Sequence, residues 1–170
     1  MPRLDSRRLR WLVFFITVPL VVIADQITKT KIRAYPVGEV IFQEGFFRIV
    51  HIENSGAAFG LFQSHSTVLM VIDFLALAII LSYFVILYRR FPLFRSVFGW
   101  LALSLIFSGT SGNLIDRLNP NIGGVTDFLY IGPWPAFNVA DSSITVGVIL
   151  LALTVLFTRE KPETPDPAQF

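Results

Sequence analysis

Four apolar segments, each long enough to cross a membrane, constrain this chain more than any other feature of its sequence. They cover residues 11–28, 67–88, 97–115 and 139–157. A helix needs about 20 predominantly apolar residues to span a hydrocarbon core of about 30 Å. Because backbone polar groups cannot stay unpaired in lipid, each segment is predicted to be helical. The sequence therefore predicts an all-α membrane protein with four transmembrane helices.

Composition supports this class and excludes others. Of the 170 residues, 54% are hydrophobic and only 15% are charged, which is too little charge for a soluble domain of this size. The length predicts a single membrane domain over residues 1–170. The chain has no cysteine and two separated histidines, His51 and His65, so we predict no disulfide, no metal site and no cofactor. The net charge of +2 gives no reason to expect nucleic-acid binding.

A stretch rich in β-forming residues separates the first two spans. Residues 35–63 carry β-branched and aromatic runs that are interrupted at Gly38 and Gly45, a pattern typical of short strands. We predict a small extracytoplasmic β-rich region here rather than a fifth span. Its aromatic side chains either lie against the membrane or belong to a sheet that caps the bundle: Phe46, Phe47, Phe59 and Phe62. The Pro-rich segment 159–170 is predicted to be disordered.

Basic residues are distributed unevenly between the two sides of the spans. Nine lie before the first span, between the second and third, or after the fourth, whereas five lie in the other connections. Cytoplasmic loops carry the excess of Lys and Arg, so both termini are predicted to be cytoplasmic. The N-terminal segment also resembles a secretory signal peptide. We expect an uncleaved span instead, because three spans would place the termini on opposite sides.

Acidic side chains from three spans are predicted to reach one depth, near the outer edge of the hydrocarbon. At ~1.5 Å per residue, Asp25 lies roughly 21 Å, Asp116 about 28 Å and Asp141 about 24 Å above the cytoplasmic ends of their helices. Asp127 joins them from the loop between the third and fourth spans. Three asparagines accompany the acids: Asn54, Asn113 and Asn138. A single acid at a helix end commonly marks the interface, but this convergence predicts a site.

Spacing along the helices leaves structural roles open for several of these residues. Asp25 and Lys29 are four apart, the spacing of an ion pair within a helix. Asp116 and Arg117 are adjacent and can form a charge pair at a helix end. For both pairs a structural role is as well supported as a chemical one. Asp73 in the second span has no evident partner and is left unassigned.

Two neighbouring carboxylates at the edge of a low-dielectric region suit one kind of catalysis. Like charges close together cannot both ionise easily, so such a pair tends to share one proton. The ionised acid takes a proton from water as the water attacks a carbonyl carbon, and the protonated acid donates to the carbonyl oxygen. This aspartic protease arrangement needs no metal. Three alternatives stay open: a bound cation, an ion- or proton-coupled carrier, and a non-catalytic assembly factor.

Five short motifs resemble, in order, the signature blocks of bacterial lipoprotein signal peptidases, also called signal peptidase II. They are DQITK (25–29), ENSGAAFG (53–60), SGNLIDRL (111–118), VTDF (125–128) and FNVADSSI (137–144). The resemblance implies an intramembrane aspartic endopeptidase of the bacterial inner membrane, with its active site at the outer face. Such enzymes remove signal peptides from diacylglyceryl-modified prolipoproteins by cutting before the lipidated cysteine. The resemblance also implies inhibition by globomycin, with the lipidated precursor and membrane lipids as partners.

The resemblance assigns roles to particular residues. The catalytic dyad corresponds to Asp127 and Asp141. The positions that bind substrate or support the dyad correspond to nine further residues: Asp25, Lys29, Asn54, Gly56, Asn113, Asp116, Arg117, Asn138 and Ala140. One position departs from the family pattern, because Ser55 stands where threonine is common, and it keeps the hydroxyl group.

Overall fold

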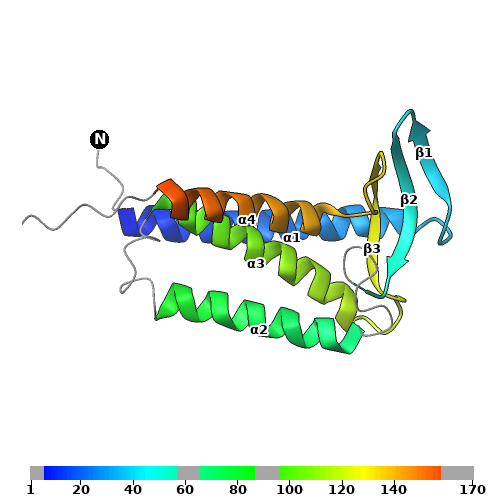
Figure 1. The fold of residues 1–170 in the computed structure, drawn as a ribbon. Coiled ribbons are helices and arrows are strands. Elements are labelled where there is room, and N and C mark those ends of the chain that lie inside the picture. Colours follow the sequence, from blue (N-terminus) through cyan, green and yellow to red (C-terminus); the bar gives the residue numbers. More distant parts are fainter. Residues whose placement is uncertain (1–5, 57–65, 87–95, 158–170) are drawn as a thin grey trace, which may run out of the picture.

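The computed structural model describes residues 6–56, 66–86 and 96–157, which form four helices and three strands (Figure 1). In chain order these are α1 (Ser6–Ile32), β1 (Val40–Glu44), β2 (Phe47–Asn54), α2 (Ser66–Val85), α3 (Val97–Leu118), β3 (Val125–Ile131) and α4 (Val139–Phe157). Each helix is long and apolar enough to cross a membrane, so the predicted fold class is confirmed. Three parts of the prediction lie outside the described residues: the segment 57–63 with Phe59 and Phe62, residues 87–88 of the second span, and the segment 159–170.

Two helices extend further than the apolar runs that predicted them. α1 continues to Ile32 rather than ending near residue 28, and α3 continues to Leu118 rather than ending near residue 115. The extra turns are polar, and they stay helical because other parts of the protein pair with their side chains. Asp116 and Arg117 consequently belong to the last turn of a helix.

α3 is the central helix of the bundle. It packs against α1, α2 and α4, and 61% of its membrane-crossing segment is buried, compared with 6%, 22% and 17% for the other helices in chain order. The outer helices expose large apolar side chains such as Phe15, Ile79 and Leu156. An apolar surface of this extent is suited to contact with lipid rather than water.

An aromatic cluster joins three helices at the end of the bundle away from the sheet. Phe84 of α2 and Trp100 of α3 are both buried, with their ring centroids 4.7 Å apart. Trp11 of α1 meets Trp100 edge-on at 5.0 Å. Buried aromatic pairs contribute about 0.5–1.5 kcal/mol beyond the area they bury. This end of the bundle is therefore held by packing, whereas the opposite end is polar.

A glycine lets α3 approach α4 closely, as the small residues of SGTSGN (108–113) predict. A Cβ atom added at Gly109 would overlap the carbonyl oxygen of Ala140 and lie 2.7 Å from Cγ1 of Ile144. We expect Gly109→Ala to push the helices apart and lower the free energy of unfolding by about 1–3 kcal/mol. Thermal unfolding in detergent measures this, with Ser111→Ala on the same helix as the control. Equal unfolding temperatures for the two variants would contradict the packing argument.

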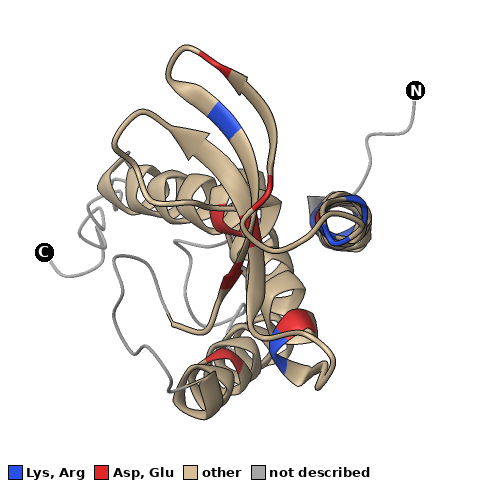
Figure 2. Cartoon of the chain, turned by 90° about the vertical axis from the view of Figure 1, so that its right-hand side faces the viewer, with Lys and Arg blue, Asp and Glu red and all other residues tan. Residues whose placement is uncertain are grey.

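The strands form an antiparallel sheet of order β1–β2–β3 that stands across one end of the bundle (Figure 1). β1 and β2 form a hairpin whose turn contains Gly45 with a φ of 55°, a left-handed conformation that glycine adopts without strain. β2 pairs with β3, which places Ile52 opposite Asp127. Viewed onto this end, acidic residues lie on several elements around the middle of the molecule (Figure 2).

β3 corrects the sequence prediction, which placed Asp127 in a loop. Residues 125–131, VTDFLYI, are mostly β-branched or aromatic, but a segment this short becomes a regular strand only when it has a partner. β2 is that partner. Gly124 permits the approach, since an added Cβ would lie 2.5 Å from the carbonyl carbon of Asn54. The backbone around Asp127 is thus held by a sheet.

Candidate active site

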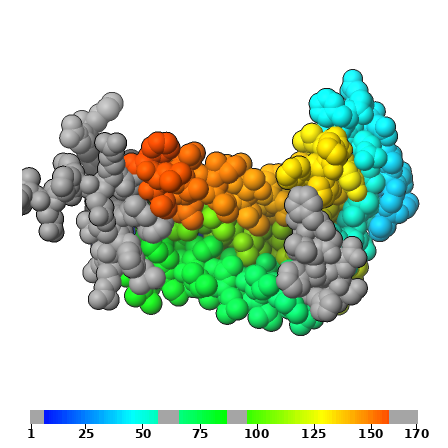
Figure 3. Space-filling model, in the orientation of Figure 1, coloured from blue at the N-terminus to red at the C-terminus, as the bar shows by residue number. Residues whose placement is uncertain are grey.

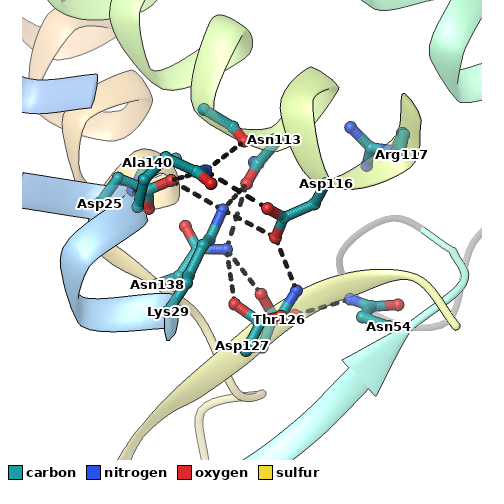
Figure 4. A network of polar contacts seen from close by, with 12 residues as sticks. Asp25, Lys29, Asn54, Asn113, Asp116, Arg117, Thr126, Asp127, Asn138 and Ala140 are labelled. Carbon is teal, nitrogen blue, oxygen red and sulfur yellow. Dashed lines mark hydrogen bonds and ion pairs between the residues drawn. The ribbon is translucent and has the colours of Figure 1, made fainter. Parts of the chain in front are cut away.

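Most of the predicted site residues meet where the sheet joins the bundle (Figure 4). The network draws on α1, α3, α4, β2 and β3, and it includes these side chains and one backbone group: Asp25, Lys29, Asn54, Asn113, Asp116, Asp127, Asn138, Ala140 and Asp141. Its members include Asp25 and Ala140, which are 115 positions apart in the chain. The fold therefore brings together the acids that the helix geometry placed at one depth.

Asp127 is almost fully buried, with 2% of its surface exposed, and two asparagine side chains hold it. Nδ2 of Asn138 donates to its Oδ1 at 2.7 Å, and Nδ2 of Asn54 donates to its Oδ2 at 2.9 Å. The backbone N–H of Gly56 donates to Oδ1 of Asn54 at 3.0 Å. That bond orients the Asn54 amide so that its NH₂ group faces Asp127.

Asp141 lies in the first turn of α4, where reciprocal hydrogen bonds hold it. Its backbone N–H donates to Oδ1 of Asn138 at 2.8 Å, and its Oδ2 accepts from the backbone N–H of Asn138 at 3.2 Å. This is a capping box, in which the two residues satisfy each other's free N–H groups. Its Oδ1 accepts from Nδ2 of Asn113 at 2.8 Å. The start of α4 thus sets the direction of this carboxylate.

Asn138 connects the two aspartates. Its side chain is fully buried, and it donates to the carboxylate of Asp127 while accepting from the backbone of Asp141. Its Nδ2 also lies 3.2 Å from Oδ1 of Asn113. An asparagine suits this position because it presents donors and an acceptor on one planar group. One side chain therefore determines the relative placement of both acids.

A buried ion cluster centred on Lys29 lies behind the aspartates. Its Nζ is 2.8 Å from Oδ2 of Asp25 and 3.2 Å from Oδ2 of Asp116, and none of the three side chains is exposed. The predicted ion pair between Asp25 and Lys29 is confirmed. Lys29 also donates to Oδ1 of Asn113 at 2.9 Å, which turns the NH₂ group of that amide toward Asp141. The lysine thus acts on Asp141 through Asn113.

Asp25 also holds the start of α4. Its Oδ1 accepts from the backbone N–H of Ala140 at 2.9 Å, a group that has no partner inside the helix. Gly112 makes room for this contact, because an added Cβ would lie 2.6 Å from Oδ2 of Asp25. Ala140 itself is fully buried, so its small side chain suits the same junction.

Two residues that the sequence analysis missed, Arg33 and Thr126, hold β3 in place beside Asp127. Arg33 pairs with Oδ1 of Asp116 at 2.6 Å, and its Nε donates to Oγ1 of Thr126 at 2.7 Å. The backbone N–H of Thr126 donates to Oδ2 of Asp116 at 3.0 Å. In the sequence Arg33 is only one of the basic residues that indicate topology, because nothing local in the sequence indicates that β3 lies next to it.

Arg117 does not pair with Asp116, which corrects the predicted charge pair. Its Nη1 lies 2.7 Å from Oδ2 of Asp73 on α2, whereas Asp116 pairs with Lys29 and Arg33 on the side of α1. Adjacent residues on a helix do not face each other, so the two side chains turn to different neighbours. Asp73, which had no predicted partner, has one in the structure.

Asp127 and Asp141 both line a pocket with a volume of about 850 Å³. Side chains from α2, α3, α4 and β3 surround it, and the surface is visibly hollowed where α4 meets β3 (Figure 3). Much of the lining is apolar: Leu69, Val125, Ile131, Trp134, Pro135, Ala136, Phe137, Ile144 and Val146. Four ionisable side chains interrupt it: Asp73, Arg117, Asp127 and Asp141. A pocket of this size and character suits a large and mostly apolar ligand.

The surroundings of Asp127 favour its protonated form. Burial, and next the negative charge of Asp141, raise its pKa to about 7, although hydrogen bonds from Asn54 and Asn138 and the charge of Lys29 oppose the shift. A carboxyl group with a pKa near neutrality can donate a proton while an ionised neighbour accepts one. No group of three His, Cys, Asp or Glu in the described ranges is arranged to hold a metal ion. The arrangement suits acid–base chemistry on a carbonyl group.

Four helices able to span a membrane, with a buried aspartate and a partly buried one lining the same mostly apolar pocket, are the features of the membrane-embedded aspartic peptidases. Comparison with known proteins agrees with this class. The family model described as Signal peptidase (SPase) II matches residues 17–157. The chain belongs to the signal peptidase II family.

Relatives of this chain are similar over nearly their whole length. A lipoprotein signal peptidase from Dehalococcoides mccartyi is 41% identical over 159 residues, covering 92% of this chain and 98% of that protein. One from Desulforapulum autotrophicum is 39% identical and covers 88% and 96%. A bacterial membrane enzyme solved by the in meso method at 2.3 Å resolution is 31% identical with a TM-score of 0.77, covering 90% of this chain and 94% of the solved one.

Proposed function

We propose that this protein removes the signal peptide from diacylglyceryl-modified prolipoproteins, cutting before the lipidated cysteine, with Asp127 and Asp141 as its catalytic pair. Membership in the signal peptidase II family supports the reaction. One observation carries the assignment of the residues: both aspartates line the same pocket, and Asn138 binds both of them. No other pair of acids that lines this pocket in the described residues shares such a connection.

The proposed reaction uses the two acids in opposite protonation states. Asp127, with its raised pKa, donates a proton to the oxygen of the scissile carbonyl group. Asp141 in its ionised form takes a proton from water as the water oxygen bonds to the carbonyl carbon. When the tetrahedral intermediate collapses, the C–N bond breaks, Asp141 gives the proton that it took from water to the leaving amine, and Asp127 takes a proton back from a hydroxyl group of the intermediate as the C=O bond re-forms. The cysteine then carries the new N-terminus, and the pair returns to its starting state.

The position of the pocket suits a lipid-anchored substrate. It lies at the junction of helices and sheet, where the scissile bond of a membrane-anchored peptide would be presented, and its apolar lining suits acyl chains. The distribution of Lys and Arg supports cytoplasmic termini, with the sheet and the pocket at the outer face of the inner membrane. We propose that globomycin, a peptide antibiotic, competes for this pocket.

A gel-shift assay with purified full-length protein and a purified precursor tests the proposal. We expect a diacylglyceryl-modified precursor to be shortened, the same precursor without the lipid to remain intact, and globomycin to stop the reaction. Cleavage that is indifferent to the lipid would contradict the proposed substrate class. Failure to cleave the lipidated precursor in a folded preparation would contradict the proposed activity.

The rate of cleavage is expected to fall as the pH rises above about 7. The sign follows from the raised pKa of Asp127: below about 7 this acid keeps its proton and can donate it, whereas above about 7 it ionises and the pair loses its donor. Initial rates measured in detergent from about pH 5 to about pH 9 give a pH–rate profile, and its descending limb shows where the rate falls. A rate that still increases through the upper half of that range would contradict the role assigned to Asp127.

A further inference from the structure

The pocket contains a second pair of charges that the proposed chemistry does not use. Arg117 of α3 and Asp73 of α2 line it together with the two catalytic aspartates. Nη1 of Arg117 lies 2.7 Å from Oδ2 of Asp73, and the two side chains are only 10% and 15% exposed. Asp73 lies within a membrane-spanning helix, where an ionised side chain is costly and commonly functional.

Arg117 lines the same pocket as both catalytic aspartates. Asn113, one turn earlier on the same face of α3, donates to Asp141 at 2.8 Å. Among the described residues that line the pocket, Arg117 is the one cation, and the three acids are Asp73, Asp127 and Asp141. A guanidinium group binds carboxylates strongly. Without Asp73, its nearest anionic partners in the pocket would be the two catalytic acids.

We propose that Asp73 is a positioning residue that holds Arg117 against α2 and so keeps its guanidinium group off the catalytic carboxylates. This inference rests on the proposed function. A guanidinium group bound to Asp127 would favour the ionised form of this acid, and the pair would lose the proton that it must donate. It would also occupy the space that the attacking water needs.

The other charged groups around the aspartates have partners that do not depend on α2. Four of them form one cluster on and beside α1 and α3: Asp25, Lys29, Arg33 and Asp116. On β2, Glu53 accepts from the backbone N–H of Gly123 at 3.1 Å, and Nδ1 of His51 lies 2.7 Å from the carbonyl oxygen of Tyr35. Removing the carboxylate of Asp73 therefore releases Arg117 and leaves these contacts in place.

The test is the pH dependence of cleavage by the full-length enzyme on a lipidated precursor. We expect Asp73→Asn to shift the descending limb to lower pH by about one unit, because an opposite charge nearby lowers a carboxyl pKa by about 1–3 units. The rate near pH 7 should then fall about fivefold, because the protonated fraction of Asp127 would drop from about one half to about one tenth. Asp73→Glu keeps the charge, so its cleavage rate should fall at the same pH as that of the unmodified enzyme. Asp73→Ser is measured alongside, so that the result does not depend on the folding of one variant.

A double variant identifies the released arginine as the cause. In Asp73→Asn combined with Arg117→Gln, the cleavage rate should fall at the same pH as in Arg117→Gln alone. If Asp73 were only a structural link between α2 and α3, its loss would lower the unfolding temperature and leave the limb unmoved, which would overturn the inference. Asp127→Asn in the same assay distinguishes a failure of the role proposed for Asp73 from a failure of the proposed function. If Asp127→Asn is inactive and the descending limb of the pH–rate profile of Asp73→Asn is unmoved, only the role proposed for Asp73 fails. Normal turnover by Asp127→Asn would contradict the proposed function as well.

Discussion

Asparagine in place of either Asp127 or Asp141 is expected to reduce cleavage of a lipidated precursor by about 100- to 10,000-fold, the usual contribution of one acid–base group. The amide has nearly the shape of the carboxyl group, but it neither accepts a proton from water nor donates one to a carbonyl oxygen. One acceptor oxygen remains to receive a hydrogen bond from Asn54 or Asn138 at position 127, so the local fold should persist. The rate is measured by gel shift on protein whose folding has been checked by thermal unfolding.

Glu44→Gln is the matched control for these variants. It also exchanges a carboxylate for an amide, but Glu44 lies exposed on β1 and away from the pocket lining. We expect it to cleave at the rate of the unmodified enzyme. Normal turnover by Asp127→Asn or Asp141→Asn would leave the aspartic mechanism without support. Solute flux in vesicles carrying the protein would then decide between a carrier and an assembly factor.

Lys29→Met is expected to lower the free energy of unfolding by about 3–5 kcal/mol, the usual cost of removing one partner from a buried ion pair. Methionine fills a similar volume without the charge. The carboxylates of Asp25 and Asp116 would lose their shared cation, although Arg33 would still contact Asp116. Asn113 would lose the shorter of the two hydrogen bonds that orient its amide toward Asp141 and would keep the one from Asn138, so the remaining folded enzyme should also cleave more slowly.

Lys31→Met provides the comparison for stability. Lys31 lies two residues further along α1 and is exposed, so its loss should change the free energy of unfolding by about 0.5 kcal/mol or less. Thermal unfolding in detergent near neutral pH measures both variants. If both variants unfolded at the same temperature, the cluster around Lys29 would not be contributing the stability that its burial indicates.

Much of the fold could be predicted because its causes are local. Each span is a run of apolar residues that only a helix can carry through lipid, and β1 and β2 follow from β-branched and aromatic runs around a glycine turn. The polar ends of α1 and α3 could not be predicted in this way. Lys29 and Asp116 continue their helices because they are buried against each other, and an apolar run contains no information about such a partner.

The candidate site was predictable to the extent that depth and motif spacing placed its acids together. Counting the rise along three helices put Asp25, Asp116 and Asp141 at one level, and the structure brings them into one region. The strand that carries Asp127 was taken for a loop, since its regularity comes from pairing with β2. Arg33 was overlooked for a similar reason, because its partner Thr126 is 93 positions away.

The amino-acid sequence was sufficient to predict the four spans, to give an expectation for their orientation and to name most of the residues that meet at the candidate site. These properties depend on hydrophobic length, on charge near the ends of the spans and on short motifs, all of which act within a few residues. The tertiary structure alone decided which charge pairs with which: Asp116 with Lys29 and Arg33, and Arg117 with Asp73. Ion pairs form over a few ångströms, and segments far apart in the chain come within that distance only once the helices and the sheet have packed.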